Sequence, residues 1–400
     1  MIDYLNQKKL ILKIKQNVTL EYIESLYDKL YNSKKEKTID IKLPTKILQS
    51  DFSVLTSFLQ FVSTWLRKDN SGDLRLPIKE IEQFDEYLNQ EFVYPVIVLC
   101  WERQIIDENE INIRNKLKKP SQDYFNKMEY LELKSNESIP IYCFDHDLSK
   151  RGYSRFLYEL DKTVVSEEAL DFNLYSVFEK IGNFFNREVF KKSIRPVMED
   201  FAKITHELFL NTDEHAKTDI KGNNLYPNIR SVYFKFHKRT LRNYKKDYSK
   251  NKGLIKYFDS GLALNDISEL YLFEISVIDS GPGLIKRFEN IASLDSITLE
   301  EEVEIIKKCL FKHNTSSIGI NKKNKGLGLN RVLETIDEKG FLRIKTGRTD
   351  VFRDMRNSKY VKAKSPSEIV LNDWNTNSID FTEHKKAEGT LISIIYPLGL

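Results

Sequence analysis

Apolar and polar residues alternate with two different periods in residues 1–80. Three short segments show the alternation of half-buried strands: 9–15, 38–43 and 74–77. Two stretches between them repeat apolar residues at helical spacing and predict amphipathic helices: 20–32 and 51–67. An order of strand, helix, strand and helix favours a small α/β domain, which we place in residues 1–150.

From about residue 165 the periods become clearer. Three stretches have helical spacing: 169–192, 196–216 and a segment that begins at Thr298, where Glu301 completes a capping-box pattern. Four stretches have the pattern of strands: 229–237, 272–278, 341–346 and 390–396. A basic, polar insert at 238–270 separates the first two of these strands.

These patterns together predict an α+β protein. We expect residues 165–400 to form an α/β sandwich in which one helical layer covers a mixed sheet. The smaller α/β domain would precede this sandwich in the chain.

Composition narrows the class of protein further. Lys and Arg number 63 and Asp and Glu 59, so a net charge of +4 does not favour a nucleic-acid binder that uses its whole surface. The three cysteines are widely spaced, which disfavours a disulfide framework or a zinc ribbon. The longest apolar run, at 93–101, is far shorter than the ~20 residues that span a bilayer. We expect a cytoplasmic protein that does not enter the membrane.

The first chemical motif lies in the helix predicted at 196–216. Glu207, Asn211 and His215 follow one another at intervals of four residues, so they drift by only about 40° per step around one helical face. An amide oxygen on that face can bind a hard cation, and a carboxylate one turn away can orient an attacking water. The same spacing also occurs on solvated helical faces.

The second motif ends the strand predicted at 272–278. Asp279 follows this strand and opens the turn Asp-Ser-Gly-Pro-Gly, with glycines at 281 and 283. A carboxylate at the end of a buried strand can accept a hydrogen bond from an exocyclic amine such as that of adenine. Gly281 and Gly283 allow a flat ring to approach the backbone closely. A simple strand-ending turn would have the same sequence.

The third motif is a polar loop followed by a glycine-rich helix start. Glycines at a helix start expose backbone N–H groups to a phosphate. The residues that we expect at this site are Thr315, Ser316, Lys325, Gly326, Leu327, Gly328 and Leu329. A fourth motif, Gly389 and Thr390, leads into the last strand.

The order of the four motifs, each on the expected element, resembles the Bergerat-fold ATP-binding domain of the GHKL superfamily, which includes gyrases and histidine kinases. The resemblance covers roughly residues 170–400. It implies that Asn211 coordinates the Mg²⁺ of bound ATP and that Glu207 is the general base. It also implies that Asp279 binds the adenine amine in a pocket shaped by Gly281 and Gly283.

The same resemblance assigns the glycine-rich segment to a lid over ATP. Thr315, Lys325, Gly326 and Gly328 would belong to this lid. Four further residues complete the expected contacts with ATP: His215, Ser316, Leu327 and Leu329, and Thr390 joins them from the last strand. Three functions stay open: a slow ATPase that acts as a nucleotide-controlled switch, an anti-sigma-type serine/threonine protein kinase, and a module that binds ATP without hydrolysing it. In the first, the lid would couple nucleotide state to a protein partner or to self-association.

Two other segments suggest partners. Between Lys235 and Lys256 stand nine basic residues and one acid, with Tyr244 and Tyr248 among them, a composition suited to gripping a phosphate backbone. A solvated loop would have the same charge. The N-terminal region resembles a STAS-like domain in element order alone, which would make it a regulatory or partner-binding unit.

Overall fold

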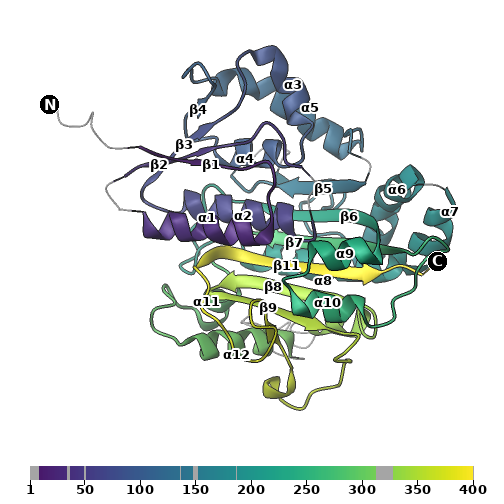
Figure 1. Cartoon of the computed structure of the whole chain (residues 1–400). Coiled ribbons are helices and arrows are strands. Elements are labelled where there is room, and N and C mark those ends of the chain that lie inside the picture. The colour runs from purple at the N-terminus through teal and green to yellow at the C-terminus, as the bar shows by residue number, and fades with distance from the viewer. Residues whose placement is uncertain are drawn as a thin grey trace.

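The computed structural model describes residues 9–33, 37–48, 51–135, 137–146, 152–185, 187–311 and 328–399. Helices and strands form an α+β protein with one parallel and one antiparallel sheet (Figure 1), which confirms the predicted fold class. No helix in the described part of the chain is both long and apolar enough to cross a membrane.

The N-terminal sheet is parallel, with the strand order β1-β2-β3-β4. Its strands are β1 (Leu10–Lys13), β2 (Ile39–Lys42), β3 (Ser71–Arg75) and β4 (Ile105–Ile106). The first three lie close to the segments predicted from the sequence. Parallel neighbours need crossover connections, and helices provide them.

The helices of this region cover the sheet and extend beyond it. They are α1 (Leu20–Asn32), α2 (Val54–Leu66), α3 (Phe84–Leu88), α4 (Val93–Leu99) and α5 (Lys118–Glu129), with the 3₁₀ turns η1 (Ile81–Gln83) and η2 (Arg114–Leu117). Thr19 caps α1 by accepting a hydrogen bond from the Tyr22 N–H. Every residue of α2 is buried, so the predicted amphipathic helix has no solvated face.

The rest of the chain builds the larger sheet and its helices. Its strands are β5 (Ser138–Cys143), β6 (Arg230–Thr240), β7 (Glu269–Asp279), β8 (Phe341–Gly347), β9 (Thr349–Asp354), β10 (Asn372–Asp373) and β11 (Ala387–Pro397). Its helices are α6 (Glu167–Phe185), α7 (Arg187–Val189), α8 (Met198–His215), α9 (Leu241–Asp247), α10 (Lys252–Phe258), α11 (Leu284–Glu289), α12 (Leu299–Leu310) and α13 (Gly328–Thr335). Short helical turns complete it: η4 (Phe190–Ile194), η5 (Arg195–Val197) and η6 (Pro366–Glu368).

The larger sheet has the strand order β10-β9-β8-β11-β7-β6-β5, and each pairing in its described strands is antiparallel. The expectation of a mixed sheet was therefore wrong. The reason lies in the connections: β8 and β9 form a tight hairpin, and β11 returns between β7 and β8 in the opposite direction to both. β5 falls within residues 1–150, yet it pairs with β6 in this sheet.

Both faces of the larger sheet are covered, so the expectation of one helical layer was also wrong. One face packs on α6, α8, α12 and α13 around a shared core. The other face packs on α2 of the N-terminal region and on the helices α9 and α10 of the insert. Figure 1 shows α1 and α2 between the two sheets. A helix in that position must be apolar or paired on all sides, which explains the complete burial of α2.

Candidate functional site

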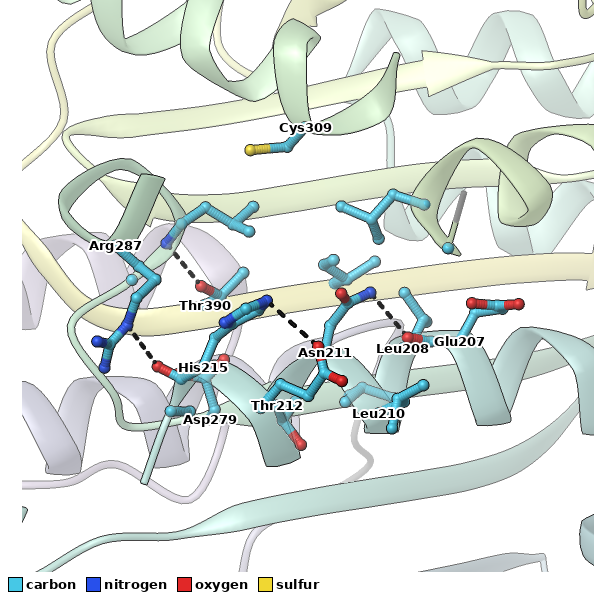
Figure 2. Close-up of a pocket in the computed structure, with 18 of the residues that line it drawn as sticks. Glu207, Leu208, Leu210, Asn211, Thr212, His215, Asp279, Arg287, Cys309 and Thr390 are labelled. Carbon is cyan, nitrogen blue, oxygen red and sulfur yellow. Dashed lines mark hydrogen bonds and ion pairs between the residues drawn. The ribbon is translucent and has the colours of Figure 1, made fainter. Parts of the chain in front are cut away.

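Helix α8 places three predicted site residues along one cavity. Glu207, Asn211 and His215 all line it, and Figure 2 shows them on consecutive turns. On the adjoining side of α8, Phe201, Ile204 and Leu208 are buried in the core, and Leu208 also lines the cavity. This apolar anchoring fixes which face of the helix meets the cavity.

The Asn211 amide has a defined orientation. Its Nδ2 donates a hydrogen bond to the backbone oxygen of Glu207 at 2.8 Å. This contact uses the nitrogen of the amide, so Oδ1 is the atom that the side chain offers to a cation. An amide oxygen of this kind suits a hard cation such as Mg²⁺.

Strand β7 ends at the opposite end of the cavity with Asp279, a residue that is 6% exposed. Burial raises the pKa of the Asp279 carboxyl to about 7, although the Gly281 and Thr390 N–H groups and the guanidinium of Arg230 favour the ionised form. The Gly281 N–H donates to Oδ1 at 2.8 Å. A buried carboxylate of this kind is well suited to accept a hydrogen bond from a ligand.

The glycines of the turn after β7 have steric roles. A Cβ on Gly281 would lie 2.6 Å from the Cα of Ala216, which follows α8. Gly283 has a φ of 87°, a conformation that other residues rarely adopt. The turn can therefore pack against the end of α8 only with glycine at 281.

Helix α11 closes this end of the cavity. The Leu284 N–H donates to the Thr390 hydroxyl at 3.1 Å, and Arg287 Nε donates to the His215 backbone oxygen at 2.9 Å. Thr390 belongs to β11, and the two contacts (Figure 2) link this strand and the end of α8 to one short helix. The arrangement brings the first, second and fourth motifs together.

Helix α13 begins against Glu207 and Asn211. A Cβ on Gly328 would lie 2.8 Å from Glu207 Oε2 and 3.3 Å from Asn211 Nδ2. Gly328 and Leu329 both line the cavity. The third motif thus meets the first at the end of the cavity remote from Asp279.

Several predicted residues lie outside the described part of the chain: Thr315, Ser316, Lys325, Gly326 and Leu327. Sequence reasoning missed other residues that border the cavity or contact its residues. Arg287 and Cys309 line it, and Arg331 ion-pairs with Glu207. Arg331 follows the glycine-rich motif by one helical turn, and this spacing is the signal that would have suggested it.

The basic segment differs from a surface built for stacking bases. Tyr244 is 2% exposed and packs with Phe258 in the core under α9 and α10. Arg239 pairs with Asp51 and Asp247, and Lys245 pairs with Asp259. Tyr244 therefore supports the insert and does not face a partner, and nucleic-acid binding stays a prediction.

We compared the chain with protein-family models, with curated proteins and with solved structures, and none of the three comparisons gives a match.

Proposed function

We propose that this protein is a GHKL-type ATPase that binds Mg-ATP in the cavity between α8, β7, α11 and α13 and hydrolyses it slowly. The observation that carries the proposal is that the four sequence motifs meet in this cavity. Four short motifs that are far apart in the sequence contribute residues to one cavity, as the resemblance to the GHKL domain implies. Asp279 lies at one end, and Glu207, Asn211 and Gly328 lie at the other.

The Asp279 end suits the adenine. Its carboxylate can accept the exocyclic amine, and Val277 and Ile392 from neighbouring strands supply apolar surface for the ring. Gly281 and Gly283 keep the turn free of Cβ atoms where the backbone approaches its neighbours most closely.

The Glu207 end suits the phosphates. Asn211 Oδ1 would hold Mg²⁺, which when bound would neutralise phosphate charge. Glu207 would orient a water and take its proton as the water oxygen attacks the γ-phosphorus. The bond from the γ-phosphorus to the bridging β,γ-oxygen breaks, and ADP and phosphate leave. Turnover of this kind would make the nucleotide state a switch for a protein partner.

The test is Mg-ATP turnover by the full chain with γ-labelled ATP, comparing the wild type with Glu207→Gln. We expect the wild type to release phosphate and the variant to bind ATP but lose turnover by about a hundredfold or more, because general-base catalysis contributes about 10²–10⁴-fold. Glu199→Gln is a matched control, since Glu199 is exposed on the same helix.

The same labelling experiment separates the alternatives. Free phosphate that disappears in Glu207→Gln supports the ATPase. Label transferred to a protein would instead indicate the serine/threonine kinase. ATP binding without turnover or transfer would indicate a binding module, and absence of ATP binding would refute the proposal.

A further inference from the structure

Arg331 on α13 joins two carboxylates that belong to two other helices. One terminal nitrogen of its guanidinium donates to Glu207 Oε1, and the other donates to Glu167 Oε2 at 2.8 Å. Glu207 lies on α8 and Glu167 begins α6. The Glu207 side chain is 9% exposed, so this ion pair lies at the margin of the interior.

The charges around Glu207 make the arginine necessary. Ligand atoms of Glu167, His206 and Glu207 lie within 4.8 Å of one another. Two carboxylates so close together repel unless a cation lies between them. Among the described residues, Arg331 is the cation that forms an ion pair with Glu207.

The two oxygens of Glu207 have different surroundings. Oε1 is held by Arg331, whereas Oε2 lies on the side of Gly328, which lines the cavity beside Asn211. Arg331 is not among the residues that line the cavity. Its guanidinium therefore fixes the rotation of the Glu207 carboxylate from the side away from the cavity. Oε2 remains directed toward the cavity.

We infer that Arg331 is a positioning residue that keeps Glu207 turned toward the phosphate end of the cavity, an inference that rests on the proposed ATPase function. Loss of the guanidinium leaves Glu167 and Glu207 to repel each other, and the Glu207 carboxylate rotates away from the water that it must orient. Turnover then falls while nucleotide binding, which depends on other residues, persists.

The test measures kcat and KM for Mg-ATP, and Kd for a non-hydrolysable ATP analogue, in the full chain. For Arg331→Ala we expect kcat to fall by about ten- to a hundredfold, since a displacement of about 1 Å in a catalytic group can cost that much. Kd should change by less than about twofold. Arg331→Lys should recover part of kcat, because an ammonium group can still pair with Glu207.

Arg331→Gln keeps a hydrogen-bond donor but removes the charge. It replaces the alanine variant in the same measurements if the alanine variant does not fold. Arg242→Ala is the control, because Arg242 is exposed on α9, far from Glu207 in the sequence and on the other face of the sheet. Unchanged kcat in the folded alanine or glutamine variant would overturn the inference. A loss of analogue binding as large as the loss of kcat, or no recovery with lysine, would also overturn it. Absence of turnover in the wild type would instead refute the ATPase proposal itself.

Discussion

At the scale of single residues, Asp279 is the group whose ionisation links the site to pH. Burial raises the pKa of its carboxyl to about 7 from the usual aspartate value of 3.8. Because the folded-state pKa is raised, the carboxyl contributes stability in its protonated form at low pH. That contribution is lost as the pH rises from about 4 to about 7.

We predict that Asp279→Asn raises the melting temperature above that of the wild type at pH 8. The amide has no charge to bury, and its oxygen can still accept the Gly281 N–H. The advantage should shrink as the pH falls and disappear below about pH 3, where both the folded and the unfolded wild type are protonated. Thermal unfolding at a series of pH values measures it, and a variant less stable than the wild type at pH 8 would contradict it.

The same substitution should weaken ATP binding. An asparagine amide has one oxygen and one NH₂ group. If its oxygen accepts the Gly281 N–H, its NH₂ group can face the adenine amine, and two donors then oppose each other. We expect Kd for Mg-ATP to rise by about tenfold or more, because a mismatched buried polar pair costs about 1–3 kcal/mol. Calorimetric titration at pH 8 measures it, and unchanged affinity would exclude Asp279 as the adenine acceptor.

At the scale of elements, α2 connects the N-terminal region to the backbone of the cavity. The Thr64 hydroxyl accepts a hydrogen bond from the Glu388 N–H at 3.0 Å, just before Gly389 and Thr390. Arg67, which follows α2, donates to the backbone oxygens of Pro227 at 2.6 Å and of Ser280 at 3.4 Å. α2 and the residue after it therefore bind the backbone of β11 and of the turn after β7, which carry the Asp279 end of the cavity.

Glu388 extends this connection to α11. Burial alone would raise the pKa of its carboxyl, but the ion pairs with Lys286 and Lys386 hold that pKa below its usual value. Lys286 belongs to α11, whose first N–H binds the hydroxyl of Thr390. The pairing of β11 with β8 shifts register between Ala387 and Thr390, so this stretch has no regular ladder to hold it.

We predict that Thr64→Val lowers ATP affinity severalfold as well as stability. The substitution leaves the Glu388 N–H without its acceptor, at a cost of about 1–3 kcal/mol, and frees the backbone that presents Thr390. Titration with the ATP analogue and thermal unfolding check it. Thr56→Val is the matched control, because Thr56 is equally buried on α2 but donates within its own helix, to the Ser53 oxygen. Equal effects of both variants on affinity would contradict the connection.

At the scale of the whole molecule, the two sheets share a core. Residues of α1, α2 and α4 pack with Tyr142, Tyr233, Ile278 and Leu391 of the larger sheet. Polar contacts cross the same interface, including the ion pair at 2.7 Å between half-buried Glu24 and buried Lys345. The N-terminal region is therefore part of the support of the larger sheet.

We predict that the full chain unfolds in one cooperative transition. Separation of the two regions would expose the apolar residues that pack around α2. Neither region should therefore unfold while the other stays folded. Scanning calorimetry checks this by comparing the calorimetric and van 't Hoff enthalpies, which agree for a two-state transition. Two resolved transitions would show that residues 1–150 and 165–400 are independent domains.

The sequence alone was informative where the physics is local. The capping box at Thr298 and Glu301 is present as predicted, because its partners are three residues apart. The strand before Asp279 and the helix with Glu207 were also predicted, since periodicity reports which positions are buried. β10 and β9 were missed. β10 has only two residues, and β9 carries buried polar residues at four of its six positions, so neither shows the apolar pattern of a strand.

The candidate site divides in the same way. Its chemical groups and the elements that carry them could be predicted from the sequence, from Glu207 on a helix to Asp279 at a strand end. The sequence did not reveal that β11 lies beside β7 and brings Thr390 to Asp279, or that Arg331 reaches Glu207. The position of α2 between two sheets was likewise not evident from the sequence. Periodicity records that a residue is buried, whereas the identity of what covers it depends on contacts between residues far apart in the chain.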